Sequence, residues 1–123
     1  MNSILIVEDE YILAMLLEKQ LSRKGYVISG KAASGEEAVE MVKEKRPDLV
    51  LMDIKLNGEM DGIDAVRAFQ DDHPCPVIYV TGNSDSAIRE RAMQTNPVDY
   101  LLKPLEIKDL VRSIEKGLQS QNS

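Results

Sequence analysis

Leu49-Val50-Leu51-Met52 is a run of four apolar residues that leads directly into one carboxylate, Asp53. A short apolar run bounded by turn signals predicts a strand that is buried on both faces, and residues 54–58 then lead away as a loop. Asp53 is therefore expected where this strand leaves the sheet, and ligands of open α/β sheets bind at that edge. An aspartate after a strand can also simply start a turn or cap a helix, so its meaning depends on the rest of the chain.

The pattern of an apolar strand followed by a helix repeats along the chain. Strands are expected at residues 3–7, 26–32, 49–52, 77–80 and 98–102, with 26–32 nearer the sheet edge because it mixes apolar and polar residues. Helices are expected at about 10–24, 34–45, 84–94 and 106–118, and one more opens near Gly62. This alternation predicts an α/β fold: a doubly wound, five-stranded parallel sheet with helices on both faces.

Several helix ends and faces carry their own signals. Ser34, with Glu37 three positions later, predicts a capping box, and Ser84 is expected to cap the helix that runs to about residue 94. That helix should have a narrow core face, because its apolar residues are few and mostly small. In the helix at 10–24, Leu13, Leu17 and Leu21 should form an apolar stripe with Leu16 beside it. A polar tail is expected from about residue 119.

Composition limits the possible classes of protein. The 123 residues suit a single domain, and 43% apolar and 29% charged residues are ordinary for a water-soluble protein. No apolar run approaches the roughly 20 residues of a membrane span, and no leader for export is evident. A single cysteine, Cys75, fits a reducing cytoplasm. The net charge of −6 comes without a basic stripe, so direct nucleic-acid binding is not expected.

Polar side chains stand at the ends of four predicted strands: Glu8 and Asp9, Asp53, Thr81 and Lys103. In a parallel sheet these ends share one edge, so three carboxylates, a hydroxyl and an ammonium are brought together. Three carboxylates alone would repel one another, and oxygen ligands favour Mg²⁺ over zinc. His73 and Cys75 fall at the opposite edge and are interpreted as packing or surface residues.

Together these pieces make the sequence resemble the receiver domain of two-component response regulators. The resemblance covers residues 3 to about 118, and its motifs are Val7–Glu10, Leu51–Asp53, Met60–Gly62, Val80–Gly82 and Asp99–Pro104. It implies a flavodoxin-like sheet with strand order 2-1-3-4-5, a single receiver domain over residues 1–123 and a cis bond between residues 103 and 104. The domain's partner would be a sensor histidine kinase or a phosphotransfer protein.

The resemblance also implies the chemistry of the site. Asp53 would accept a phosphoryl group from a phosphohistidine, with Mg²⁺ held directly by Asp9, Asp53 and the backbone carbonyl of Lys55, and by Glu8 through water. Lys103 would pair with Asp53 and later with a phosphoryl oxygen. Such a protein is not an enzyme in the ordinary sense, because it catalyses only its own phosphorylation and dephosphorylation.

The output implied by the resemblance is a change of shape. Thr81 would bond a phosphoryl oxygen, and Tyr100 would turn inward to fill the space that the threonine leaves. The face formed by the fourth helix, fifth strand and fifth helix would then bind an effector or a second copy of the chain. Tyr100 could instead be an ordinary half-buried strand residue.

Three features depart from the commonest receiver pattern. Glu8 replaces the more usual aspartate, the loop from Asp53 to Gly62 is one residue longer with Gly58 near a usual proline position, and residues 96–98 replace the usual Gly-Ala. Lys55 and Asn83 flank the site and are equally well explained as tuning residues for phosphate loss or as solvated loop residues.

Three other functions compete with a phosphorylation switch. Enzymes of the haloacid-dehalogenase type need a second acid two residues after the nucleophile, where this chain has Lys55. A pseudo-receiver without chemistry would not need the complete polar set at the strand ends. A nucleotide- or flavin-binding domain would need glycines after the first strand, where Glu8-Asp9-Glu10 stands. The chain could be a stand-alone regulator, a phosphate shuttle or a piece of a larger protein.

Overall fold

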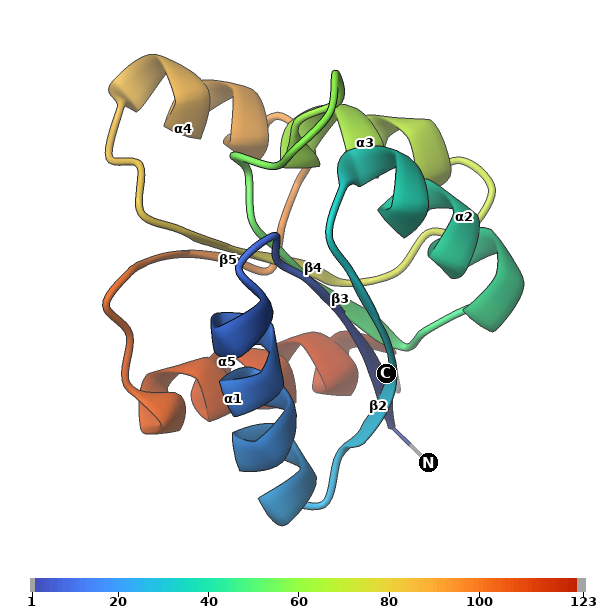
Figure 1. The fold of residues 1–123 in the computed structure, drawn as a ribbon, viewed down its shortest axis with the longest axis vertical. Coiled ribbons are helices and arrows are strands. Elements are labelled where there is room, and N and C mark those ends of the chain that lie inside the picture. Colours follow the sequence, from blue (N-terminus) through green and yellow to red (C-terminus); the bar gives the residue numbers. More distant parts are fainter. Residues whose placement is uncertain (1, 122–123) are drawn as a thin grey trace.

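All five strands of the sheet run parallel, in the order β2-β1-β3-β4-β5, in a computed structural model that describes residues 2–121. The strands are β1 (Ser3–Val7), β2 (Val27–Ala32), β3 (Leu49–Met52), β4 (Val77–Thr81) and β5 (Asp99–Leu102). The helices are α1 (Tyr11–Arg23), α2 (Gly35–Lys45), α3 (Gly62–Phe69), α4 (Ser86–Met93) and α5 (Ile107–Gln121). Helices α1 and α5 cover one face of the sheet and α2, α3 and α4 the other (Figure 1). The predicted fold class and strand order are confirmed.

Two apolar cores lie on the two faces of this sheet. Successive side chains of a strand point to opposite faces, so Leu5 and Val7 of β1 pack with α2 and α3, whereas Ile4 and Ile6 pack with α1 and α5. β3 divides its four buried residues in the same way. Central strands covered on both faces have little freedom to move, so they provide rigid positions for the residues that follow them.

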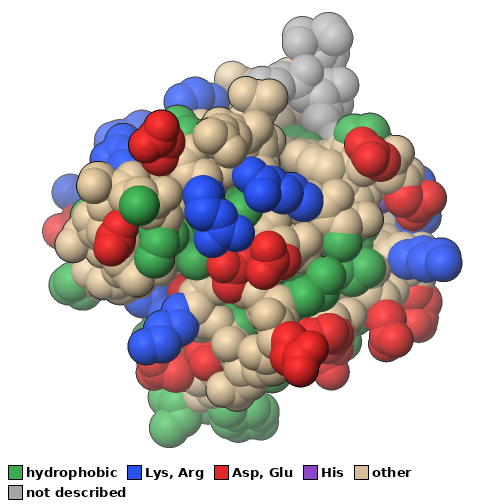
Figure 2. All heavy atoms as spheres, turned by 90° about the horizontal axis from the view of Figure 1, so that it is seen from above, with side chains coloured by type: hydrophobic (Ala, Val, Ile, Leu, Met, Phe, Trp, Pro, Cys, Tyr) green, Lys and Arg blue, Asp and Glu red, His purple; other side chains and the backbone are tan. Residues whose placement is uncertain are grey.

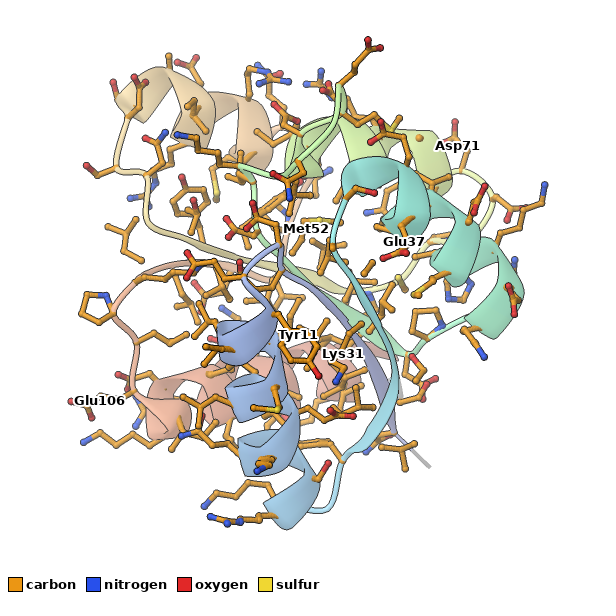
Figure 3. The ribbon with its side chains drawn as sticks, in the orientation of Figure 1. Tyr11, Lys31, Glu37, Met52, Asp71 and Glu106 are labelled. Carbon is orange, nitrogen blue, oxygen red and sulfur yellow. The ribbon has the colours of Figure 1, made fainter. Side chains whose placement is uncertain are left out.

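Strand β2 lies at the edge of the sheet, as its mixed composition predicts. Its pairing with β1 shifts register between Ile4 and Leu5, which leaves Ser29 as an extra residue opposite β1. Lys31 of β2 bonds Glu18 of α1 at 2.7 Å, and its ammonium lies 5.9 Å from the centre of the Tyr11 ring. Figure 3 shows Tyr11 and Lys31 side by side between α1 and β2. These contacts fasten α1 over the edge strand.

The helix caps differ in part from the predicted ones. The Ser34 hydroxyl accepts from the Glu37 amide at 3.1 Å, but the Glu37 carboxylate accepts from the Ala33 amide at 2.8 Å, so only half of the predicted capping box forms. The prediction that Ser84 caps the fourth helix is wrong. Asp85 caps α4, because its carboxylate accepts from the amides of Ala87 and Ile88 at 2.8 and 3.3 Å.

Two further predictions about helices are corrected. Leu16 was expected to extend the apolar stripe of α1 but is 49% exposed, because it lies about 100° around the helix from Leu17 and so outside the buried stripe of Ala14, Leu17 and Leu21. Helix α5 continues to Gln121, so the predicted polar tail from about residue 119 is helical as far as residue 121, and residues 122–123 lie outside the described part. Among residues 2–121 no helix combines the length and the apolar character needed to cross a bilayer.

Cys75 and His73 have structural surroundings that agree with their interpretation as packing residues. Cys75 is buried, and the His73 imidazole nitrogen Nε2 lies 2.7 Å from the carbonyl oxygen of Pro47. Burial raises the pKa of the Cys75 thiol to about 12, and the nearby Asp48 carboxylate adds to the rise.

A buried thiol with a raised pKa should react slowly with thiol reagents. We expect Cys75 in the folded protein at pH 8 to react with a chromogenic disulfide roughly a hundredfold more slowly than in the urea-unfolded chain, because only the exposed thiolate reacts. The absorbance of the released thiolate measures this rate. Equal rates in the folded and unfolded protein would contradict the packed position of Cys75.

Candidate functional site

The carboxyl ends of β1, β3, β4 and β5 surround a polar pocket of about 640 Å³. Of the side chains predicted at the strand ends, all but Glu8 line it, and Glu8 contacts Lys103. The lining includes Asp9, Asp53, Lys55, Thr81 and Lys103, and the loop residues Asn83 and Ser84 close one side. Parallel strands bring these residues together because each strand ends at the same edge of the sheet.

Asp53 is a buried carboxylate at the end of the central strand, with 7% of its surface exposed. Its Oδ1 accepts from the backbone amide of Ile54 at 2.7 Å, and its Oδ2 accepts from the Lys103 ammonium at 2.9 Å. Both bonds orient the carboxylate in the pocket. The peptide bond between Lys103 and Pro104 is cis, as the resemblance implies.

Glu8 is the second partner of Lys103, which the sequence did not predict. The Lys103 ammonium lies 2.5 Å from Glu8 Oε1, while Glu8 Oε2 accepts from the Glu10 amide at 3.1 Å. Glu8 is only 5% exposed. Burial, with a smaller contribution from the Asp53 charge, raises the pKa of Glu8 to about 7, although the bonds to Lys103 and to the Glu10 amide oppose the rise. Burial lowers the pKa of Lys103, but its bonds to Glu8 and Asp53 outweigh that effect and leave the pKa raised.

Glu8, Asp9 and Asp53 form a group of donors that fits a divalent cation. Each offers one carboxylate oxygen, and these oxygens lie within 4.8 Å of one another. One lysine cannot balance three carboxylates at the rim of a buried sheet, and all the donors are oxygen atoms, which suits Mg²⁺. The longer side chain of Glu8 already bonds Lys103 and a backbone amide, whereas Asp9 and Asp53 line the open pocket.

Thr81 and Tyr100 are joined through one residue of the β4–α4 loop, Asn83. The hydroxyl of Thr81, which is 1% exposed, accepts from the Asn83 amide at 3.2 Å, and the Tyr100 hydroxyl donates to the Asn83 carbonyl at 3.2 Å. The half-buried Tyr100 ring centre lies 6.2 Å from that of Tyr79, and the Arg89 guanidinium lies 5.5 Å from it. A movement of the Thr81 hydroxyl would therefore disturb a residue that also holds Tyr100.

The start of α3 lies against the backbone of Asp53 and Ile54, and it has a cap that was not among the sequence predictions. Asp61 Oδ1 accepts from the Asp64 amide at 2.8 Å, and Asp64 Oδ2 accepts from the Asp61 amide at 3.1 Å. This reciprocal arrangement is a capping box, and the spacing Asp61-x-x-Asp64 is the signal that could have revealed it. Gly58 in the preceding loop has φ +94°, a conformation that explains a glycine at this departure from the family pattern.

Comparison with known proteins shows that the chain is similar to response regulator receiver domains. A family model described as the response regulator receiver domain matches residues 4–115. The transcriptional regulatory protein PdtaR of Mycobacterium tuberculosis is 40% identical over 112 residues, which are 91% of this chain and 54% of PdtaR. The chain thus spans about half the length of that relative. The chemotaxis protein CheY of Thermotoga maritima is 33% identical over 114 residues, 92% of this chain and 94% of CheY.

A solved structure gives the same result. The signal receiver domain of a modulated diguanylate cyclase from Desulfovibrio desulfuricans superposes with a TM-score of 0.91 at 37% identity, and the match covers 98% of this chain and 95% of that one.

Proposed function

Because the chain belongs to the family of response regulator receiver domains, we propose that it is a phosphorylation-dependent signalling switch whose phosphoryl acceptor is Asp53. One observation carries the proposal: the Asp53 carboxylate lies at the end of the central strand, in an open polar pocket, with the Lys103 ammonium 2.9 Å away. The donor would be a phosphohistidine of a sensor histidine kinase or of a phosphotransfer protein. We further propose that residues 1–123 act as one receiver domain and that the protein works in the cytoplasm.

In the proposed reaction, a carboxylate oxygen of Asp53 attacks the phosphorus atom of the donor. The new O–P bond forms as the P–N bond breaks, and the bonding electron pair returns to the imidazole nitrogen of the donor. Lys103 would offset negative charge on the phosphoryl oxygens, and Thr81 would donate its hydroxyl to one of them. These residues act by positioning and charge compensation, which suits phosphoryl transfer. Apart from its own phosphorylation and dephosphorylation, no catalysis is proposed.

The proposed metal site uses Asp9, Asp53 and the backbone carbonyl of Lys55 directly, with Glu8 acting through water. The bonds that Glu8 already makes to Lys103 and to the Glu10 amide support this outer position. When bound, Mg²⁺ would neutralise charge between the acceptor carboxylate and the incoming phosphoryl group.

The proposal is tested by mapping the site of modification. The protein is incubated with Mg²⁺ and a small phosphodonor such as acetyl phosphate, and the modified residue is located by mass spectrometry. One added phosphoryl group on Asp53 is expected. A phosphoryl group on another residue, with Asp53 unmodified, would contradict the assignment.

Addition of Mg²⁺ should stabilise the folded protein, because the carboxylates are brought together into a binding site only in the native state. We expect about 2.7 kcal/mol of added stability at a free Mg²⁺ concentration 100 times the dissociation constant. Thermal unfolding monitored by circular dichroism measures the shift. The matched variant Asp9→Asn should show a much smaller shift in melting temperature. An equal shift in both proteins would mean that Asp9 is not a ligand of the metal.

The output would begin at Asn83, the residue that joins Thr81 to Tyr100. If the Thr81 hydroxyl turns to a phosphoryl oxygen, it gives up its bond to the Asn83 amide, and the Asn83 carbonyl that Tyr100 holds can then move. Among residues 86–93 of α4, Ala92 alone is buried, so this helix can shift at low cost. The face formed by α4, β5 and α5 would change and bind an effector or a second copy of the chain.

Thr81→Ala should separate phosphorylation from this output. Asp53 should still accept a phosphoryl group, but the changes in amide exchange at residues 81–94 and in the environment of the Tyr100 ring should weaken, because the alanine cannot bond the phosphoryl oxygen. Hydrogen exchange with and without a phosphoryl mimic measures both regions. An undiminished response in Thr81→Ala would contradict the coupling and leave the acceptor assignment intact.

Effectors of this domain are proposed to be proteins. PdtaR is named a transcriptional regulatory protein, and about half of its length lies outside the match. On the face seen in Figure 2, acidic and basic side chains are interspersed and form no continuous basic stripe. With a net charge of −6, direct contact of this domain with nucleic acid is not proposed.

A further inference from the structure

Helix α4 is attached to α3 by a charged contact in place of an extensive apolar one. The Arg91 guanidinium of α4 bonds two carboxylates of α3 and its cap: Nη1 lies 3.1 Å from Asp61 Oδ2, and Nη2 lies 3.3 Å from Asp64 Oδ1. Within residues 86–93, Ala92 is the one buried residue. Because apolar packing fixes α4 weakly, a directional contact of this kind has a large share in setting where the helix lies.

The two carboxylates that receive Arg91 are the same two that form the capping box of α3. Each uses one oxygen for the cap and the other for the guanidinium, so all four oxygens are engaged. Burial acts to raise the pKa of Asp61, but the bonds from the Asp64 amide and from Arg91 outweigh it and lower that pKa. Arg91 therefore contacts both carboxylates that cap the first turn of α3.

That first turn rests directly on the backbone of the acceptor residue. The Gly62 amide donates to the Ile54 carbonyl at 2.7 Å. A Cβ at Gly62 would lie 2.0 Å from the carbonyl oxygen of Asp53, which shows how closely the two backbones approach. A continuous series of direct contacts thus runs from the Asp53 backbone through Gly62 and the Asp61–Asp64 cap to Arg91 on α4.

We propose that Arg91 is a positioning residue that links the acceptor site to α4 through the cap of α3, as a second connection beside Thr81, Asn83 and Tyr100. The inference rests on the proposed function. A shift of the Asp53 backbone would move the start of α3, and the two bonds of Arg91 would transmit that shift to α4. Thermodynamic linkage makes the connection reciprocal, so it also biases the acceptor site when α4 is held by a partner.

The test compares Arg91→Gln with the wild type and with Arg112→Gln. The control also removes one arginine charge from a helix, but Arg112 lies on α5 and pairs only loosely, at 3.7 Å, with Asp109. Hydrogen exchange of residues 86–93 is followed with and without beryllium fluoride and Mg²⁺ as a phosphoryl mimic. In Arg91→Gln the mimic-induced change should fall by about threefold or more, within the range found for residues of a coupled network. Arg112→Gln should respond like the wild type.

Further variants test the same connection between the cap of α3 and α4. Asp64→Asn retains the size of the capping residue and removes one carboxylate from Arg91, so it should reduce the response in the same direction even if Arg91→Gln proves unstable. Thr81→Ala should leave a residual response that the double variant Thr81→Ala/Arg91→Gln loses. An unchanged α4 response in both Arg91→Gln and Asp64→Asn would overturn the inference.

The phosphoryl mass on Asp53 is measured in separate samples of the same proteins, incubated with acetyl phosphate and Mg²⁺ without beryllium fluoride, and should be the same in Arg91→Gln and in the wild type. Failure of the wild type to accept that mass would contradict the proposed function itself, so the two failures are distinguishable.

Discussion

Asp53→Asn should abolish the phosphoryl adduct completely, while the folded structure is retained. The asparagine side chain has the size of the aspartate that it replaces at a position only 7% exposed, and its oxygen can still accept from Ile54 or Lys103. An amide, however, lacks the negative charge that makes the carboxylate a nucleophile toward phosphorus. Intact-mass spectrometry after incubation with acetyl phosphate and Mg²⁺ should show no added phosphoryl group.

The matched control for this experiment is Asp71→Asn, which removes one acidic charge outside the pocket. Figure 3 labels Asp71 beyond the end of α3, on the periphery of the molecule, and Met52, the neighbour of Asp53, near its centre. Asp71→Asn should accept one phosphoryl group as the wild type does. A full phosphoryl mass on Asp53→Asn would mean that another residue is the acceptor, and the proposed function would then lose its central residue.

Gly62→Ala should destabilise the protein more than any other glycine-to-alanine change near the site. The new Cβ would lie 2.0 Å from the Asp53 carbonyl oxygen and 2.9 Å from the Ile54 Cα, and both are backbone atoms of a buried strand end. Neither can rotate away as a side chain does, so the start of α3 or the Asp53 backbone must move. We expect a loss of about 3 kcal/mol and a fall in melting temperature of about 10 °C.

Gly82→Ala is the control for the effect of an added methyl group. Among the described residues no heavy atom other than those of its chain neighbours lies within 4 Å of a Cβ placed there, so the change in stability should stay within about 0.5 kcal/mol. Urea unfolding followed by circular dichroism measures both variants. Equal stability of Gly62→Ala and Gly82→Ala would mean that α3 does not lie as close to the Asp53 backbone as described. The proposed role of Arg91, which depends on the contact between Gly62 and Asp53, would then lose its support.

Local sequence determined the sheet and the polar edge of this protein. The apolar runs at residues 4–7, 49–52 and 77–80 have the short length typical of strands covered on both faces, and each is followed by a break in the apolar pattern. Parallel strands end at the same edge of the sheet, so the grouping of the polar residues at these ends can be predicted without knowing how the side chains pack. These residues are Glu8, Asp9, Asp53, Thr81 and Lys103. The helical spacing of apolar residues located four helices to within about three residues, and the start of the remaining one was expected near Gly62.

The partners of individual polar groups were decided only by the tertiary structure. Lys103 contacts Glu8 as well as Asp53, the Glu37 carboxylate turns to Ala33, and Asp85 takes the capping position expected for Ser84. The bond from Arg91 to Asp61 and Asp64 joins segments about thirty residues apart. Side chains of this kind choose among several nearby acceptors, and the choice depends on distances of a few tenths of an ångström that arise only when the helices settle on the sheet. Periodicity specifies which face of an element is buried, whereas hydrogen-bond partners depend on how whole elements are placed against one another.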